Sequence, residues 1–137
     1  MNKILTNIEN GWCNFNLGDF NGHPSYIKYL PFDVLDAYNY YKYNNHCIMD
    51  FDCETYQFCL IIWEYNLIIL DNKNDKINTT VIDIDAEEVL NELVNEIIND
   101  IDLWARWISM DVTDKGIEFA KQNILNKIKE YNIKGDE

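Results

Sequence analysis

The sequence lacks a long uninterrupted hydrophobic run and a leading apolar segment. Its most apolar stretch, YQFCLIIWEYNLIIL at residues 56–70, is interrupted by Glu64-Tyr65-Asn66. A membrane-spanning helix needs about 20 consecutive apolar residues, so this stretch is too short to cross a bilayer. The first residues, MNKILTNIENGWCNFN, include one lysine and no continuous apolar run. We therefore expect no secretory signal, and we expect a cytoplasmic protein.

Basic residues are scarce. The 137-residue chain has 11 Lys and Arg against 24 Asp and Glu, which gives a formal net charge of -13. Binding to nucleic acid or to an anionic membrane surface needs a basic footprint, so we expect neither partner. The negative charge favours solubility, or fast association with a basic protein. Hydrophobic residues make up 47% of the chain, which argues against disorder despite the charge.

Recognisable metal and catalytic motifs are also missing. The only histidines are His23 and His46, and neither belongs to a nucleophile motif or a metal-ligand spacing. The cysteines fit neither a CxxC pair nor a zinc site, so we expect reduced and mostly buried thiols at Cys13, Cys47, Cys53 and Cys59. We predict no metal, no cofactor and no catalytic residue.

What the sequence does contain is a succession of hydrophobic patterns typical of an α+β fold. Alternating or β-branched segments predict strands at 12–20, at 46–54, in each half of 56–70, and at 77–84. Helical spacing predicts helices at 31–43, 85–110 and 115–131. We expect one domain, residues 1–137, built on an antiparallel meander of about four to six strands. One short and two longer helices should cover one face of this sheet.

The stretch 56–70 is expected to form the central pair of strands. Both of its halves are apolar at odd and at even positions, which indicates burial on both faces of the sheet. Glu64 should mark the hairpin turn, and Asn21-Gly22 should form an earlier turn. We also expect four tryptophans to pack in the core, namely Trp12, Trp63, Trp104 and Trp107.

Two groups of carboxylates are candidates for binding a basic partner. The first lies on the outward face of the 46–54 strand and comprises Asp50, Asp52 and Glu54. The second lies on the 85–110 helix, where four acids fall four residues apart: Glu88, Glu92, Glu96 and Asp100. Like charges at this spacing oppose helix formation by about 0.2–0.5 kcal/mol per pair. Tyr40 and Tyr43 are candidate aromatic anchors beside them.

Each carboxylate group also has a simpler interpretation. The strand acids fit a solvated outer face, and the helix acids fit neutral drift, because the cost of their repulsion is small. Docking of a positive surface explains both groups as well, since acids and bases are segregated along the chain. Five of the basic residues fall in or just after the last predicted helix: Lys115, Lys121, Lys127, Lys129 and Lys134.

The order of elements resembles a known class of proteins. WCNFNLGDF, then SYIKYLPFDVLDAY, the meander MDFDCETYQFCLIIWEYNLIILD and a long acidic helix cover the chain from about Trp12 to Trp107. This order is similar to that of small immunity proteins encoded beside bacterial polymorphic or contact-dependent toxins. The resemblance implies a non-enzymatic antitoxin that binds a basic toxin domain, such as a nuclease, and covers its active site. It assigns a role to no individual residue.

Two alternatives from other functional classes stay open. One is a small hydrolase that uses a histidine paired with a carboxylate as its acid and base. The other is an adaptor that oligomerises through a sheet edge or through its last helix. A histidine within hydrogen-bond reach of a carboxylate in a pocket would favour the enzyme, and a monomeric protein would count against the adaptor.

Overall fold

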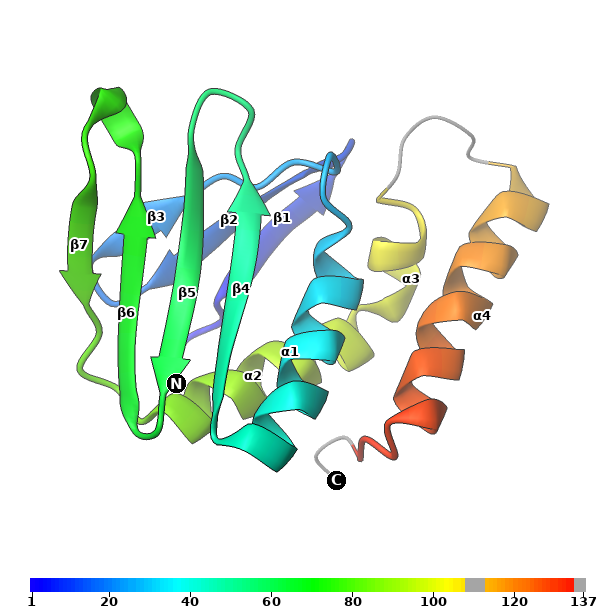
Figure 1. The fold of residues 1–137 in the computed structure, drawn as a ribbon. Coiled ribbons are helices and arrows are strands. Elements are labelled where there is room, and N and C mark those ends of the chain that lie inside the picture. Colours follow the sequence, from blue (N-terminus) through cyan, green and yellow to red (C-terminus); the bar gives the residue numbers. More distant parts are fainter. Residues whose placement is uncertain (108–112, 135–137) are drawn as a thin grey trace.

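The computed structural model describes residues 1–107 and 113–134 and confirms the α+β class. Its strands are β1 (Leu5–Glu9), β2 (Trp12–Leu17), β3 (Phe20–Gly22), β4 (His46–Asp52), β5 (Gln57–Trp63), β6 (Asn66–Asp71) and β7 (Asn78–Val81). Its helices are α1 (Leu30–Asn44), α2 (Ala86–Asn99), α3 (Ile101–Ala105) and α4 (Asp114–Glu130), with a short 3-10 turn, η1 (Lys73–Asp75). Figure 1 shows the elements in chain order.

The predicted meander is present as a four-stranded antiparallel sheet in the order β4-β5-β6-β7. The stretch 56–70 forms its central strands, β5 and β6, as expected. They are joined by a tight hairpin in which Trp63 pairs with Asn66 and Glu64 adopts a left-handed φ of 57°. The short connections keep sequence neighbours adjacent in the sheet, and this is why alternation along the chain predicted the sheet well.

A second sheet, in the order β1-β2-β3, was not predicted. Strand β1 is short, and its pairing with β2 is interrupted between Thr6 and Glu9. The turn predicted at Asn21-Gly22 is wrong, because those residues belong to β3. The chain reverses earlier, at Gly18-Asp19, where Gly18 has a positive φ of 56° that a glycine adopts without strain.

The two sheets pack together through phenylalanine rings. The ring centroids of Phe15 and Phe51 lie 5.1 Å apart, and those of Phe20 and Phe58 lie 4.7 Å apart. These four phenylalanines come one each from β2, β3, β4 and β5, and all are buried in one hydrophobic core. The close approach of the sheets leaves no room at Gly22, where an added Cβ would lie 2.6 Å from a Phe58 ring carbon.

We expect Gly22→Ala to destabilise the protein by about 1–3 kcal/mol, because the new methyl group overpacks the contact between the sheets. Urea unfolding should show a lower midpoint with an unchanged slope. Asn21→Ala, at an exposed position of the same strand, is the control and should change stability by less than about 0.5 kcal/mol. Equal stability of the two variants would contradict this packing.

The predicted long helix is two helices. Asp85 caps α2 as expected, since its side chain accepts a hydrogen bond from the Glu88 amide. The helix then ends at Asp100, whose φ and ψ of -106° and 28° are not helical, and α3 follows. Asp100 instead binds Lys3 at 2.6 Å. The end predicted at Met110 lies outside the described residues.

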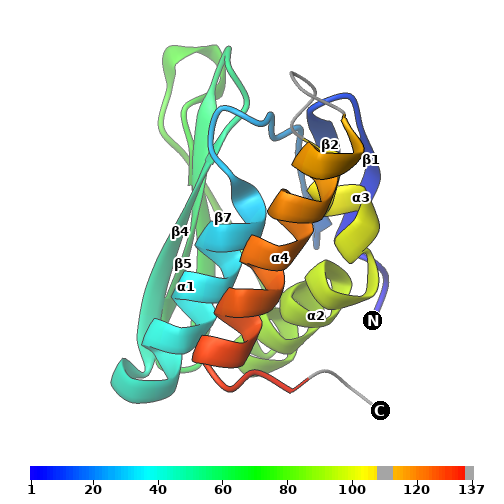
Figure 2. The ribbon, with the colours of Figure 1, turned by 90° about the vertical axis from the view of Figure 1, so that its right-hand side faces the viewer.

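The helices and the three-stranded sheet lie on the same side of the β4–β7 sheet. Figure 2 views this sheet nearly edge-on, with α1, α2 and α4 all on one side of it. The buried side chains of α1 and α2 and of the inner faces of β4, β5 and β6 belong to one core. Helices cover one face of the sheet, as predicted. No helix in the described part of the chain is long and apolar enough to span a membrane.

Candidate interaction surface

The other face of the β4–β7 sheet carries a row of apolar side chains, one from each strand. Ile48 pairs with Ile61, Ile61 pairs with Ile68, and Ile68 pairs with Val81. We call these four residues the aliphatic row. Ile48 is 61% exposed and Val81 is 75% exposed, whereas Ile61 and Ile68 are half-buried by their neighbours. Cross-strand contacts among β-branched side chains stabilise a sheet, but here they also leave a continuous apolar surface.

This outer face changes character along the strands. Towards one end, the next paired positions are Asp50, Cys59 and Leu70, which border a hollow of about 460 Å³ that Ile77 also lines. Towards the other end, His46 pairs with Trp63, and their rings lie 4.8 Å apart. The face therefore has an acidic end, an aliphatic middle and an aromatic end.

The expectation that β5 and β6 are buried on both faces is wrong. Their inner residues are buried, but Trp63 is 59% exposed on the outer face. Trp12 is half-buried and stacks on His23 instead of entering the core. Trp104 and Trp107 are buried as predicted, and the Trp107 indole donates a hydrogen bond to the Trp12 carbonyl oxygen at 2.9 Å. Apolar residues at both odd and even positions predict a strand, but they do not indicate whether a second layer covers its outer face.

The strand acids lie at the acidic end of the outer face, but only Asp50 points fully outward. Asp50 is exposed, with the Lys28 ammonium 3.9 Å away. The Asp52 carboxylate accepts a hydrogen bond from the Glu54 amide at 2.7 Å and so shapes the turn between β4 and β5. Glu54 is exposed within that turn, at a φ of 68°.

The two candidate tyrosines both lie on α1. Tyr40 is 50% exposed, and its ring packs edge-on against the His46 ring at 5.4 Å, so it adjoins the aromatic end of the outer face. Tyr43 is 77% exposed. Of the two, Tyr40 is the one that the structure brings close to the exposed sheet.

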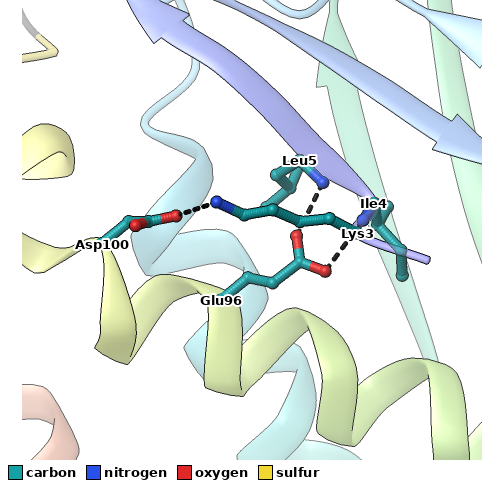
Figure 3. Close-up of polar contacts among 5 residues, drawn as sticks. All are labelled: Lys3, Ile4, Leu5, Glu96 and Asp100. Carbon is teal, nitrogen blue, oxygen red and sulfur yellow. Dashed lines mark hydrogen bonds and ion pairs between the residues drawn. The ribbon is translucent and has the colours of Figure 1, made fainter. Parts of the chain in front are cut away.

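The helix acids do not form an exposed ridge, and the prediction that Glu96 faces a partner is wrong. Glu96 is only 3% exposed. Its carboxylate accepts hydrogen bonds from the backbone amides of Ile4 and Leu5, at 2.8 and 2.7 Å. Figure 3 shows this carboxylate held between α2 and the N-terminal strand, with Lys3 bound to Asp100 beside it.

The remaining helix acids are separated from the outer face of the sheet. Glu88 is exposed and Glu92 is half-buried, and both line an acidic hollow of about 400 Å³ beside Met1. Helix α2 lies on the covered side of the sheet, away from the face that carries Asp50 (Figure 2). The two carboxylate groups therefore belong to different faces of the molecule and are not one docking surface.

Burial has a marked effect on the Glu96 carboxyl. Desolvation, followed by the hydrogen bond shared with Glu92, raises the pKa of Glu96 to about 8, and the amides of Ile4 and Leu5 oppose the shift. This group therefore holds the N-terminal strand in place and is not free to meet a partner. Its structural role was not visible in the sequence, because its donors lie more than 90 residues away.

Neither histidine is paired with a carboxylate in the described residues. His23 Nδ1 lies 2.7 Å from the Asn14 side-chain oxygen, and His46 Nδ1 lies 2.9 Å from the Asn44 carbonyl oxygen. Within residues 1–107 and 113–134, no group of three or more His, Cys, Asp or Glu side chains is placed to hold a metal ion. The geometry that would have favoured the hydrolase alternative is not found in this part of the chain.

Comparison with known proteins adds no relative. A scan against protein-family models, a search of curated proteins and a search of solved structures each returned no match to this chain. The exposed face of the β4–β7 sheet is therefore the feature from which we infer a function.

Cys59 provides a chemical reporter on this face. It is half-buried between Asp50 and Leu70, whereas Cys13, Cys47 and Cys53 are buried on the inner side. Burial raises the pKa of Cys13 to about 12 and that of Cys47 to about 11, and burial together with the nearby Asp50 also raises the pKa of Cys59. The expected difference in reactivity therefore comes from solvent access to the sulfur atom.

We expect iodoacetamide to modify Cys59 first in the native protein, at least about tenfold faster than the buried thiols, which react only through local opening. Peptide mass spectrometry over a time course identifies the modified site. Cys59→Ser should remove the fast phase and leave the slow one. Fast modification of Cys47 or Cys53 would show that the sheet is not packed as described.

Proposed function

We propose that this protein is a non-enzymatic binding protein that neutralises a basic bacterial toxin domain, as immunity proteins do. The outer face of the β4–β7 sheet is its docking surface. The observation that carries the proposal is the aliphatic row, four paired apolar side chains that no described element covers. Exposed apolar surface with a polar border is characteristic of protein interfaces.

Charge supports a basic protein as the partner. The chain carries a net charge of -13, and Asp50 lies at the edge of the aliphatic row. Such a field accelerates encounter with a positively charged domain, while the apolar row and Trp63 slow dissociation once they are covered. A toxin that cleaves nucleic acid presents a basic substrate cleft, which a rigid acidic sheet is suited to block. Under this proposal the protein acts in the cytoplasm of the cell that makes it.

A second copy of the same chain is a less favourable occupant of this face. Two copies meeting through it would bring together two molecules of net charge -13, and like charges across an interface cost binding energy. Analytical ultracentrifugation at physiological salt separates the cases. A monomer agrees with the proposal, and a dimer broken by substitutions in the aliphatic row would favour the adaptor alternative.

The proposed function can be tested first by identifying the neighbouring gene and then by a bacterial growth assay. An immunity protein is expected beside a gene for a large secreted protein with a variable C-terminal domain. Expression of that C-terminal domain alone should stop bacterial growth, and co-expression of this protein should restore it. Absence of such a neighbour, or growth arrest that co-expression does not relieve, would contradict the proposed function.

A further inference from the structure

The aromatic end of the outer face opens into a hollow of about 620 Å³. It lies where the C-terminal end of α1 meets the hairpin between β5 and β6. We call it the aromatic hollow, and its lining consists of Tyr41, Asn44, Asn45, His46 and residues 63–65. None of the acids proposed from the sequence as partner-binding residues lines this hollow. Glu64, which does line it, was expected only to mark the hairpin turn.

Two hydrogen bonds fix the hairpin to the end of the helix. The Glu64 amide donates to the Asn45 carbonyl oxygen at 2.8 Å, and the Tyr41 hydroxyl donates to the Glu64 carbonyl oxygen at 3.1 Å. The Trp63 ring is held against the His46 ring, which in turn contacts Tyr40. The walls of the hollow are therefore positioned before any ligand arrives, which lowers the entropic cost of binding.

Three features of the aromatic hollow favour a cation. The faces of Trp63 and Tyr65 are electron-rich, and both side chains are largely exposed, at 59% and 78%. Glu64 is the only Asp, Glu, Lys or Arg residue in the lining. The C-terminal end of α1, which carries partial negative charge, forms another wall.

The nearest basic residue of α1 does not fill this site. The Lys42 ammonium donates a hydrogen bond to the Tyr131 carbonyl oxygen at 3.1 Å, across the contact between α1 and the end of α4. It also lies over the Tyr38 ring, 5.7 Å from its centroid. Neither of these partners lines the aromatic hollow, so the cation that the hollow favours has to come from another molecule.

We propose that the aromatic hollow binds one arginine side chain of the partner protein. A planar guanidinium stacks on Trp or Tyr faces and pairs with a carboxylate at the same time, which a compact ammonium does less well. The hollow adjoins the aliphatic row, because Trp63 and Ile61 both lie on the outer face of β5. This inference rests on the proposed function in one respect, namely that the partner is a basic protein.

A small probe tests the hollow without the partner. The peptide acetyl-Gly-Arg-Gly-amide is titrated into the full-length protein, and the Trp63 indole N–H is followed by NMR. The expected result is a saturable shift of this signal that the citrulline peptide, its uncharged isostere, does not produce. Glu64→Gln and Tyr65→Leu, which both keep the Trp63 signal, should each weaken the binding by about two- to fivefold. Tyr43→Leu, at an exposed tyrosine outside the hollow, should leave it unchanged.

The outcomes separate this inference from the proposed function. Equal shifts with the arginine and citrulline peptides, or unchanged binding by both hollow variants, would overturn the arginine site even if the protein neutralises a toxin. A specific arginine shift in a protein that does not relieve growth arrest would support the hollow and refute the toxin-neutralising function. A shift that the citrulline peptide produces alone would assign the hollow to neutral side chains and overturn the inference.

Discussion

Glu96→Ala should destabilise the protein by about 2–4 kcal/mol, the larger of the two stability effects that we predict. The substitution removes the acceptor of two short hydrogen bonds and leaves the buried amides of Ile4 and Leu5 without a partner. Each unsatisfied buried donor costs about 1–3 kcal/mol. Because β1 pairs with β2, loss of this anchor should loosen the edge of the three-stranded sheet. Urea unfolding and amide hydrogen exchange at Ile4 and Leu5 measure both consequences.

The same carboxyl should make stability depend on pH in a defined direction. Burial raises the pKa of Glu96 to about 8, whereas an unfolded glutamic acid titrates near pH 4.3. Between these values the folded state binds more protons than the unfolded state, so the free energy of unfolding falls as pH rises towards 8. The steepest contribution is about 1.4 kcal/mol per pH unit.

Two variants make this pH effect specific. Glu96→Gln keeps one acceptor oxygen for the two amides, so it should be more stable than the alanine variant. It should also abolish the pH dependence contributed by this group. Glu88→Gln, an exposed acid on the same helix, should retain the dependence and cost less than about 1 kcal/mol. An identical pH profile for Glu96→Gln and the unmodified protein would show that the pKa of Glu96 is the same in the folded and unfolded states, which contradicts its raised pKa.

The double substitution Ile48→Lys with Val81→Lys should weaken partner binding by at least about 100-fold, equivalent to about 2.7 kcal/mol. It removes the two most exposed members of the aliphatic row and places positive charges against a basic surface. Both side chains are largely exposed, so unfolding stability should change by less than about 1 kcal/mol. Surface plasmon resonance with the toxin domain that the proposed function expects from the neighbouring gene gives the affinity.

Phe119→Lys is the matched control for this variant. Phe119 is 69% exposed on α4, on the covered side of the sheet, so the substitution makes one apolar-to-lysine change of the same kind on another face. We expect its affinity for the toxin domain to remain within about threefold of the unmodified protein, since exposed charges far from an interface act weakly. The account would be refuted if Phe119→Lys abolished binding while the double variant retained it.

Much of the fold was predictable because strong periodicity coincided with short connections. The alternation of Cys47, Met49 and Phe51 predicted β4, and Asp85 correctly marked the start of α2. Strand β1 was missed because it is short, its pairing is irregular, and its amides are held by a side chain 91 residues away. A contact between residues so far apart in the sequence cannot be predicted from the local sequence pattern.

The candidate site was predicted less well than the fold, for a related reason. Counting charges identified Asp50 and Glu96 alike, but the structure exposes one and buries the other. From the sequence, the residues of the aliphatic row could be predicted only to form strands. Apolar residues at both odd and even positions agree equally well with a sheet covered on both faces and with a sheet that has one exposed face. Which face a second layer covers is decided by the whole chain, and here the helices and the β1–β3 sheet all pack on the same side.

The most direct test of the central claim is the alkylation rate of Cys59 in the free protein and in its complex with the toxin domain. Cys59 lies on the outer face between Asp50 and Leu70, so a partner docked there covers it. The account predicts that a saturating concentration of partner slows iodoacetamide modification of Cys59 by at least about tenfold. Binding also stabilises the folded state, but the resulting decrease in unfolding should explain only a small part of this slowing. An unchanged rate at Cys59 in a saturated complex would contradict docking on this face.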